Sequence, residues 1–383
     1  MMASLRTNLF LVALGLSLLG LVMVYSATYR EYGPHYLFIR AGHVVGGVLT
    51  FLLVSRVRYT AWRKYAPAIY LVVLTLLILV LVPGVGYEAG GARRWFDMGF
   101  FSLQPAEFAK LAAVIVLSCA IARLAPGSGL PMKPLLLVGL LFALVLIEPD
   151  FGTSVVILAG VAGVLWASEI RTKDLLLAGG AGLLALIGVM LLEPYRRARF
   201  MTFLDPWSVS QDSGYQLVQS MVAIKAGSVF GAGAGAGGAA VSVPDIRTDM
   251  IFALIGEELG LFGMIAVIAA FTFVLLAGLR IAFHAPSIMS RCMAAGLTTM
   301  LAVQTTFNIG AAMGVLPLAG MTLPFISYGG SSLLVCFAAV GILYRISEDS
   351  ERAREIKPRK GATGSYSRRR HGGTRDPRAL RGG

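Results

Sequence analysis

The chain has 383 residues, of which 57% are hydrophobic and only 14% charged, and its formal net charge is +13. A soluble domain of this length would carry far more charge, so the composition excludes an ordinary water-soluble protein. The three cysteines, Cys119, Cys292 and Cys336, all fall inside apolar runs. This placement favours small buried residues over a disulfide or a metal site.

Apolar runs close to the roughly 20 residues that cross a bilayer recur along most of the sequence. The first run is followed by no small-residue cleavage pattern and by many further runs, so it is predicted to be a retained helix rather than a signal peptide. We therefore predict an all-α polytopic membrane protein. Its expected spans, about ten in number, are 8–27, 36–54, 65–83, 105–124, 134–148, 151–168, 174–192, 250–279, 288–313 and 322–346.

Basic residues in the short loops predict the orientation. They lie between the second and third runs, between the sixth and seventh, and around the loop between the eighth and ninth: Arg56, Arg58, Arg63, Lys64, Arg171, Lys173, Arg280 and Arg291. The positive-inside rule places all of them on the cytoplasmic side if both termini are cytoplasmic. The long segment between the seventh and eighth runs, about 193–249, then faces outward.

The fourth run opens on Gln104-Pro-Ala-Glu107-Phe-Ala-Lys110. Its polar residues are three apart and therefore share one stripe of the helix. Two interpretations stay open: Glu107 and Lys110 form a structural ion pair, or the stripe lines a water-filled cavity where Lys110 meets a phosphate. Arg94, in the outward loop before this helix, adds positive charge near the same mouth.

Glu148-Pro-Asp150 separates the fifth and sixth runs. Proline ends one helix and Asp150 can cap the next. Capping accounts for Asp150 but leaves Glu148 unexplained, so Glu148 is kept as a supporting polar residue of a site.

The outward segment is rich in arginine and glycine. Four arginines break the charge rule for outward loops and are therefore candidates for binding: Arg196, Arg197, Arg199 and Arg247. Residues 215–225 predict an amphipathic or re-entrant helix in the membrane interface. The glycine run 231–238 contains a formal G-x-G-x-x-G, but no strand precedes it, so we interpret it as a hinge or a close-approach surface rather than a nucleotide site.

Asp249 stands where this segment turns into the eighth run. A carboxylate at the mouth of a membrane helix is costly and usually has a task. Because it faces a basic, membrane-level cleft, it indicates chemistry on an anionic, lipid-linked substrate. Glu257 and Glu258, about two turns further along the helix, are interpreted as structural.

Four further polar residues lie in the ninth and tenth runs. Gln304 and Asn308 are four apart on one face and are expected to make hydrogen bonds between helices. Ser327 and Ser331 belong to a glycine- and hydroxyl-rich stretch, which is typical of close helix packing.

The C-terminal residues 347–383 are predicted to form a disordered basic cytoplasmic tail after a membrane domain at 1–346. Residues 352–381 hold eleven Lys and Arg among Gly, Ser and Pro. The expected partner of the tail is the anionic inner leaflet. Nucleic acid is not expected, because no aromatic or folded platform accompanies the charge.

Several short blocks occur in an order typical of one known family: Met23-Val-Tyr-Ser-Ala27, Gln104-Pro-Ala-Glu-Phe-Ala-Lys110, Glu148-Pro-Asp-Phe-Gly-Thr153, Phe203-Leu-Asp-Pro-Trp207, Ser213-Gly-Tyr-Gln-Leu-Val-Gln-Ser220, Thr248-Asp-Met-Ile-Phe-Ala253, Gly256-Glu-Glu-Leu-Gly260, Gly314-Val-Leu-Pro317 and Leu323-Pro-Phe-Ile-Ser-Tyr-Gly-Gly-Ser-Ser332. On these blocks the chain resembles the SEDS family (shape, elongation, division and sporulation proteins), and most of all its cell-division branch. Where relatives carry Glu or His just before the Thr-Asp pair, this chain has Asp245-Ile-Arg247.

The resemblance implies a ten-helix peptidoglycan glycosyltransferase that polymerises lipid II at the outer face of the bacterial cytoplasmic membrane, here at the division septum. It implies a class B penicillin-binding protein, which is a transpeptidase, and other division proteins as partners. The essential aspartate of the family corresponds to Asp249, and Glu107 and Lys110 match important cavity residues.

Chemistry fits that reaction. A sugar hydroxyl attacking an anomeric carbon needs a general base, for which Asp249 is the candidate, while the diphosphate leaving group needs cations. Arg196, Arg197 or Arg199, with Lys110, are expected to hold phosphates. No tightly bound cofactor is expected, although Asp249 could equally hold a divalent cation, Mg²⁺ or Mn²⁺. A lipid II flippase, an elongation polymerase of the same family and a non-catalytic scaffold are the alternatives.

Overall fold

The computed structural model describes residues 2–89, 92–99, 101–125, 127–192, 194–212, 214–238 and 242–356. Its helices are α1 (Met2–Tyr32), α2 (His35–Arg56), α3 (Trp62–Leu81), α4 (Pro105–Ile121), α5 (Met132–Ile147), α6 (Phe151–Trp166), α7 (Thr172–Leu192), α8 (Pro194–Leu204), α9 (Tyr215–Gly227), α10 (Ile251–Phe283), α11 (Ile288–Ala312) and α12 (Gly330–Ile356). A 3₁₀ turn at Tyr59–Ala61 precedes α3. Three short strands, β1 (Tyr87–Ala89), β2 (Ala92–Asp97) and β3 (Ser102–Leu103), form an antiparallel sheet in that order.

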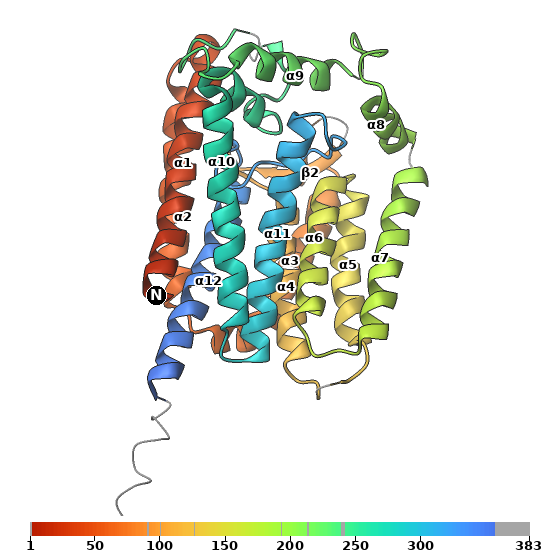
Figure 1. The fold of residues 1–383 in the computed structure, drawn as a ribbon. Helices are drawn as coiled ribbons and strands as arrows, with labels where there is room; N and C mark the ends of the chain where they lie inside the picture. The colour runs from red at the N-terminus through yellow and green to blue at the C-terminus, as the bar shows by residue number, and fades with distance from the viewer. Residues whose placement is uncertain are drawn as a thin grey trace, which may run out of the picture.

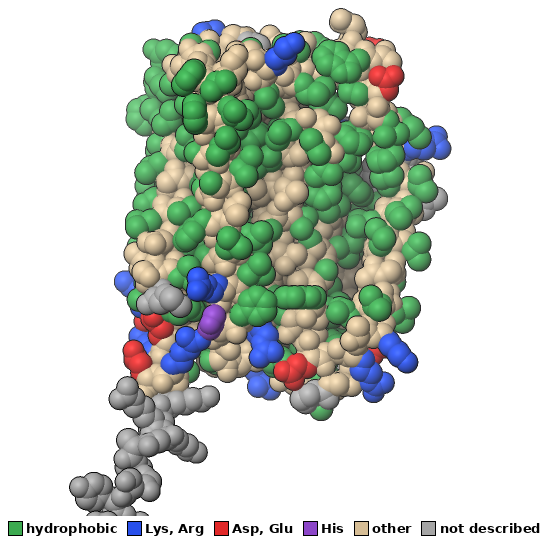
Figure 2. All heavy atoms as spheres, in the orientation of Figure 1, with side chains coloured by type: hydrophobic (Ala, Val, Ile, Leu, Met, Phe, Trp, Pro, Cys, Tyr) green, Lys and Arg blue, Asp and Glu red, His purple; other side chains and the backbone are tan. Residues whose placement is uncertain are grey.

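Every predicted apolar run contains one of these helices, so the protein is an all-helical polytopic membrane protein with a small sheet that the sequence analysis did not predict. Among the described residues, six helices are long and apolar enough to cross a membrane: α1, α2, α3, α7, α10 and α12. The helices stand side by side in one bundle, with α8 and α9 lying across one end (Figure 1). Hydrophobic side chains cover the middle of the visible face, and charged ones gather towards its ends (Figure 2).

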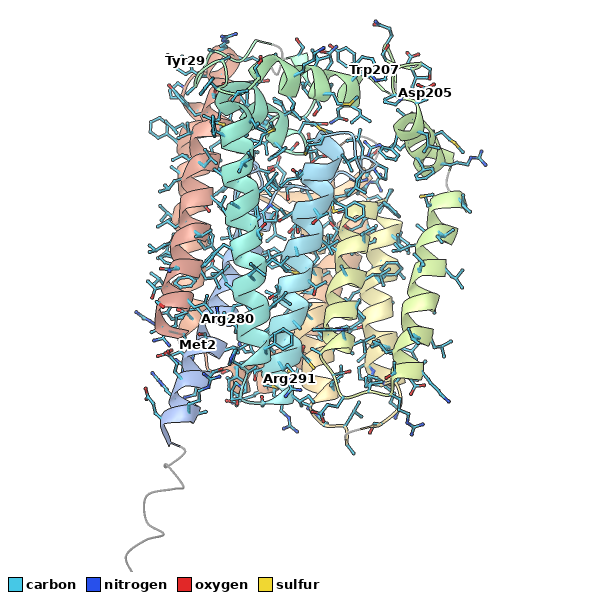
Figure 3. The ribbon with its side chains drawn as sticks, in the orientation of Figure 1. Met2, Tyr29, Asp205, Trp207, Arg280 and Arg291 are labelled. Atoms are coloured by element: carbon cyan, nitrogen blue, oxygen red, sulfur yellow. The ribbon has the colours of Figure 1, made fainter. Side chains whose placement is uncertain are left out.

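The start of α1 and the end of α12 lie at the same end of the bundle. Arg6 at the start of α1 forms an ion pair with Glu351 near the end of α12, with 2.8 Å between Nη1 and Oε2. Met2, Arg280 and Arg291 lie at this end, whereas Tyr29, Asp205 and Trp207 lie at the opposite one (Figure 3). The basic loops therefore share an end with the N-terminus, in the pattern on which the predicted orientation rests.

Small residues bring the helices into close contact. A Cβ on Gly163 of α6 would lie 2.5 Å from the Thr299 Oγ1 of α11, and one on Gly278 of α10 would lie 2.1 Å from the Thr298 Oγ1. Only glycine permits these approaches, as is common between membrane helices. Helix α7 differs from the others, because it stands at the edge of the bundle and no residue of its apolar window is buried (Figure 1).

Two predicted boundaries change. The tenth span was expected from 322, but α12 begins at Gly330, because Pro324 and the positive φ of Phe325 (64°) prevent a regular helix there. At its other end α12 continues to Ile356, past the predicted start of a disordered tail at 347. Ion pairs of Arg345 with Glu348 and Asp349, both 2.9 Å, and the pair between Arg6 and Glu351 stabilise this extension. The rest of the predicted tail, 357–383, lies outside the described residues.

The glycine-rich segment 229–238 packs against a kink in α10. Gly260 departs from helical geometry (φ 63°, ψ −161°), which frees carbonyl groups in the preceding turn. The amides of Ala232 and Gly233 donate to the carbonyls of Glu257 and Glu258, at 2.8 and 3.0 Å. The Gly238 amide donates to the Glu257 carboxylate at 2.9 Å. This segment is therefore a close-approach surface, one of the two predicted interpretations.

Candidate active site

Asp249 lies at the end of the bundle opposite the termini, directly before α10. The stretch 244–250 consists of turns, and Asp245 has a positive φ of 54°. Within the described part of the chain, no hydrogen bond to the Asp249 carboxylate is present, so this group is open to a ligand. Its own backbone carbonyl accepts a hydrogen bond from Asn308 Nδ2 at 2.9 Å.

The surroundings of Asp249 raise the pKa of its carboxyl group. Burial raises the pKa of Asp249 to about 7, the negative charges of Asp245 and Asp150 add to the rise, and Arg199 and Arg94 oppose it. A carboxyl group with a pKa near the working pH is suited to act as a general base.

Cationic side chains approach from two elements. A Cβ placed on Gly320 would lie 3.7 Å from Asp249 Oδ2 and 3.9 Å from Arg199 Nη1, so the carboxylate and the α8 guanidinium converge beside this glycine. Arg197 is exposed on the same helix, and the side chain of Arg196 lies outside the described residues. Arg94 on β2 donates to the Glu148 and Pro149 carbonyls, both at 2.8 Å, which ties the sheet to the α5–α6 turn.

Asp150 caps α6, as predicted, by accepting a hydrogen bond from the Thr153 amide at 2.9 Å. It also accepts one from Gln104 Nε2 at 2.9 Å, which links the start of α4 to the site. Glu148 is fully buried, and neither of its carboxylate oxygens has a hydrogen-bond partner among the described residues.

Glu107 and Lys110 lie deeper in the bundle and form a buried ion pair, with 2.7 Å between Oε2 and Nζ. Lys110 Nζ also donates to Gln304 Oε1 at 2.9 Å, and Gln304 Nε2 donates to the Thr322 carbonyl at 2.9 Å. This network connects α4, α11 and the loop before α12. The geometry matches the structural interpretation of the pair, and Lys110 uses donors within it.

Three further polar residues, Asn308, Ser327 and Ser331, form hydrogen bonds with backbone groups outside the helices. Asn308 donates to the carbonyls of Asp249 and Met321 instead of bonding to a neighbouring helix. Ser327 Oγ donates to the Thr248 carbonyl at 2.5 Å. Ser331 Oγ accepts from the Gln104 amide at 3.0 Å and donates to the Ser102 carbonyl at 3.1 Å. Asn308 therefore does not make the predicted hydrogen bond to a neighbouring helix, because polar groups left open by irregular backbone bind it first. The close helix packing predicted for Ser327 and Ser331 stays a prediction.

One arginine near the site, Arg40, was not predicted, and another, Arg247, was predicted only as one of the outward arginines. Arg40 of α2 is fully buried and donates through Nη2 to the carbonyls of Phe325, at 2.5 Å, and Ile326, at 3.1 Å. Arg247 lies two residues before Asp249. A charged residue inside the second apolar run was a signal for Arg40, since such residues usually have partners. Within the described part of the chain, no group of three or more His, Cys, Asp or Glu is arranged to hold a metal.

Comparison with known proteins identifies the family. The sequence model of the FtsW, RodA and SpoVE family, described as cell cycle protein, matches residues 6–352. The chain is 39% identical to the probable peptidoglycan glycosyltransferase FtsW of Coxiella burnetii, over 88% of this chain and 95% of the relative. It is 34% identical to the stage V sporulation protein E of Bacillus subtilis, over 89% and 96%.

Solved structures agree in fold. A chain from a peptidoglycan synthase complex, described as coordinating polymerization and crosslinking, matches with a TM-score of 0.75 and 28% identity, over 90% of this chain and 97% of that one. The rod shape determining protein RodA of Thermus thermophilus matches with a TM-score of 0.66 and 27% identity, over 89% and 96%. The chain therefore belongs to the SEDS family (FtsW, RodA and SpoVE) of peptidoglycan glycosyltransferases.

Proposed function

We propose that this protein polymerises lipid II into glycan strands at the outer face of the cytoplasmic membrane during septal wall synthesis. In this arrangement ten helices span the membrane, both chain ends are cytoplasmic, and the end that carries Asp249 faces outward. The observation that supports the proposal most is the convergence of the Asp249 carboxyl group, whose pKa burial raises to about 7, with the guanidinium group of Arg199 beside Gly320.

The reaction joins two lipid-linked molecules. The sugar hydroxyl oxygen of one lipid II attacks the anomeric carbon of the other, a new glycosidic C–O bond forms, and the bond to the diphosphate breaks. Asp249 takes the hydroxyl proton, and undecaprenyl diphosphate leaves as an anion that needs no protonation. Arg199, which converges with Asp249 beside Gly320, would offset its charge, and Arg197 of the same helix is a second candidate for this role. Asp249 could also hold a divalent cation, which would supply further positive charge.

A partner follows from the product. Polymerised strands must be crosslinked, so we propose a class B penicillin-binding protein and other division proteins as partners, in line with the related chain found in a peptidoglycan synthase complex. The relatives named FtsW favour septal work over elongation, the second role open to a member of this family. Depleting the protein from cells distinguishes these roles, because loss of a septal enzyme gives filamentous cells and loss of an elongation enzyme gives spherical cells.

The decisive test is polymerisation of purified lipid II by the full chain in detergent, with its cognate transpeptidase, where a flippase has no second compartment to serve. Asp249→Asn should lower the rate by about 10² to 10⁴. Asp212→Asn is the matched control, because Asp212 is an exposed acid of the same outer region. Full activity of Asp249→Asn would show that another group is the base.

A further inference from the structure

The position of Asp249 depends on its backbone. The stretch 244–250 has no helix or strand to hold it, and among the described residues no hydrogen bond fixes the carboxylate itself. Three successive carbonyl groups nevertheless have donors from one neighbouring region. The Tyr328 amide donates to Arg247 at 2.8 Å, Ser327 Oγ to Thr248 at 2.5 Å and Asn308 Nδ2 to Asp249 at 2.9 Å.

The donors are themselves held firmly. Asn308 Nδ2 also donates to the Met321 carbonyl at 2.6 Å, and Ser327 Oγ accepts from the Leu323 amide at 2.7 Å. Arg40 of α2 binds the carbonyls of Phe325 and Ile326 from the opposite side. The segment 321–328 is thus a rigid support for the stretch that carries Asp249.

Among the contacts of the described residues, Arg247 is the only residue of this stretch whose side chain contacts α2. Its guanidinium lies 4.7 Å from the centre of the Tyr36 ring and 5.9 Å from that of Tyr328. The two rings meet edge to face at 5.3 Å. Within the described residues Arg247 forms no ion pair, and its contacts are with these two rings. Such a cation–π contact is stronger when it is partly shielded from water.

We propose that Arg247 is a positioning residue: held against the rings of Tyr36 and Tyr328, it locks the backbone of Asp249 onto α2 and the 321–328 segment and so aims the carboxylate at the attacking hydroxyl. The proposal rests on the proposed role of Asp249 as the base. It also gives a function to the Asp245-Ile-Arg247 sequence in this chain.

The test measures kcat and KM for lipid II with the full chain and its transpeptidase. Arg247→Leu and Arg247→Gln should lower kcat by about 3- to 30-fold, the range expected from one shielded cation–π contact, and leave KM unchanged. Arg247→Lys and Tyr36→Phe, which keep a cation and a ring, should stay close to the wild type. Tyr36→Leu should lower kcat no more than Arg247→Leu does, because the contact of Arg247 with Tyr328 remains. The double variant should be no slower than Arg247→Leu, because that single change already removes both ring contacts.

Arg93→Leu is the matched control, since Arg93 is another arginine of the outer end and its only ion pair in the described structure is an exposed one with Glu88, at 3.0 Å. A rise in KM alone, additive losses in the double variant, or an inactive Arg247→Lys each overturn the proposal. Thermal unfolding in detergent accompanies every variant, and losses of kcat that merely follow losses of stability also overturn it. Full activity of Asp249→Asn would instead overturn the role of Asp249 as the base, and that variant is measured in the same assay.

Discussion

The ammonium group of Lys110 lies 2.7 Å from the carboxylate of Glu107, and the two side chains are only 2% and 6% exposed. Gln304 completes the environment of Lys110 from α11. An ion pair removed from water in this way tolerates the loss of both charges far better than the loss of one, because a single buried charge has nothing to offset its desolvation.

Removing one partner should therefore destabilise the protein strongly. We expect Lys110→Met to cost about 3–5 kcal/mol, and the double variant Lys110→Met with Glu107→Leu to recover most of it. Arg291→Gln, which breaks an exposed pair with Glu169 (3.5 Å), should cost less than about 1 kcal/mol. Unfolding in detergent measures all of these. A stable but inactive double variant would favour the cavity interpretation of Lys110 over the structural one.

Stability should depend on pH through Asp249. Its pKa is about 7 in the folded protein against 3.8 for an ordinary aspartate, so the folded state holds the proton more tightly. Ionisation therefore destabilises the folded state as pH rises from about 4 to about 7, and the loss is complete above that. We expect Asp249→Asn to have a higher Tm than the wild type at pH 8 and the same Tm at pH 4. Equal Tm values at both pH values would contradict the raised pKa.

Activity should follow the same group. If Asp249 is the base, kcat/KM falls on the acid side of pH 7, where the carboxyl group is protonated. The charge of Asp245 raises this pKa, so Asp245→Asn should move the acid limb to lower pH by a fraction of a unit, with Arg199, Arg94 and Asp150 left in place. The positive φ of Asp245 tolerates asparagine, so the turn is kept. If the acid limb does not move, the charge of Asp245 does not affect the pKa of the base.

The kink of α10 predicts a glycine requirement. A Cβ on Gly260 would lie 2.4 Å from the Gly231 amide nitrogen, and its φ of 63° disfavours other residues. Gly260→Ala should cost about 2 kcal/mol or more. Gly180→Ala on α7, where nothing lies within 4 Å of the added Cβ, should change stability by less than about 1 kcal/mol. Similar unfolding temperatures for the two variants would show that the segment 229–238 does not depend on this contact.

Much of the fold could be predicted from hydropathy. Each of the ten runs contains a helix, and one large boundary error, at 322–329, falls where proline and a positive φ replace a helix by turns within an apolar stretch. Hydropathy is similar for both conformations, so it could not separate them. The small sheet at 87–103 was missed because its strands are short and carry little alternation.

The acidic residues of the candidate site could be predicted from the sequence, but the contacts that hold them in place could not. Asp249 was identifiable because a carboxylate at a helix mouth is costly, and Asp150 because a cap follows a proline. Arg247 and Tyr36 are far apart in the sequence, and no spacing rule relates them. Ser327 and Ser331 were assigned to packing because their hydroxyl groups suit both packing and loop hydrogen bonds.

The sequence by itself determined which segments are helical, which end of the bundle carries the basic loops, and which carboxylate stands at the mouth of a helix, because these properties depend on local hydrophobicity and charge. Only the tertiary structure decided how Asp249 is held and what surrounds it. Its raised pKa comes from burial and from Asp245, Asp150, Arg199 and Arg94, which belong to different elements. Desolvation and Coulomb interactions depend on distance in space, and a sequence orders residues only along the chain.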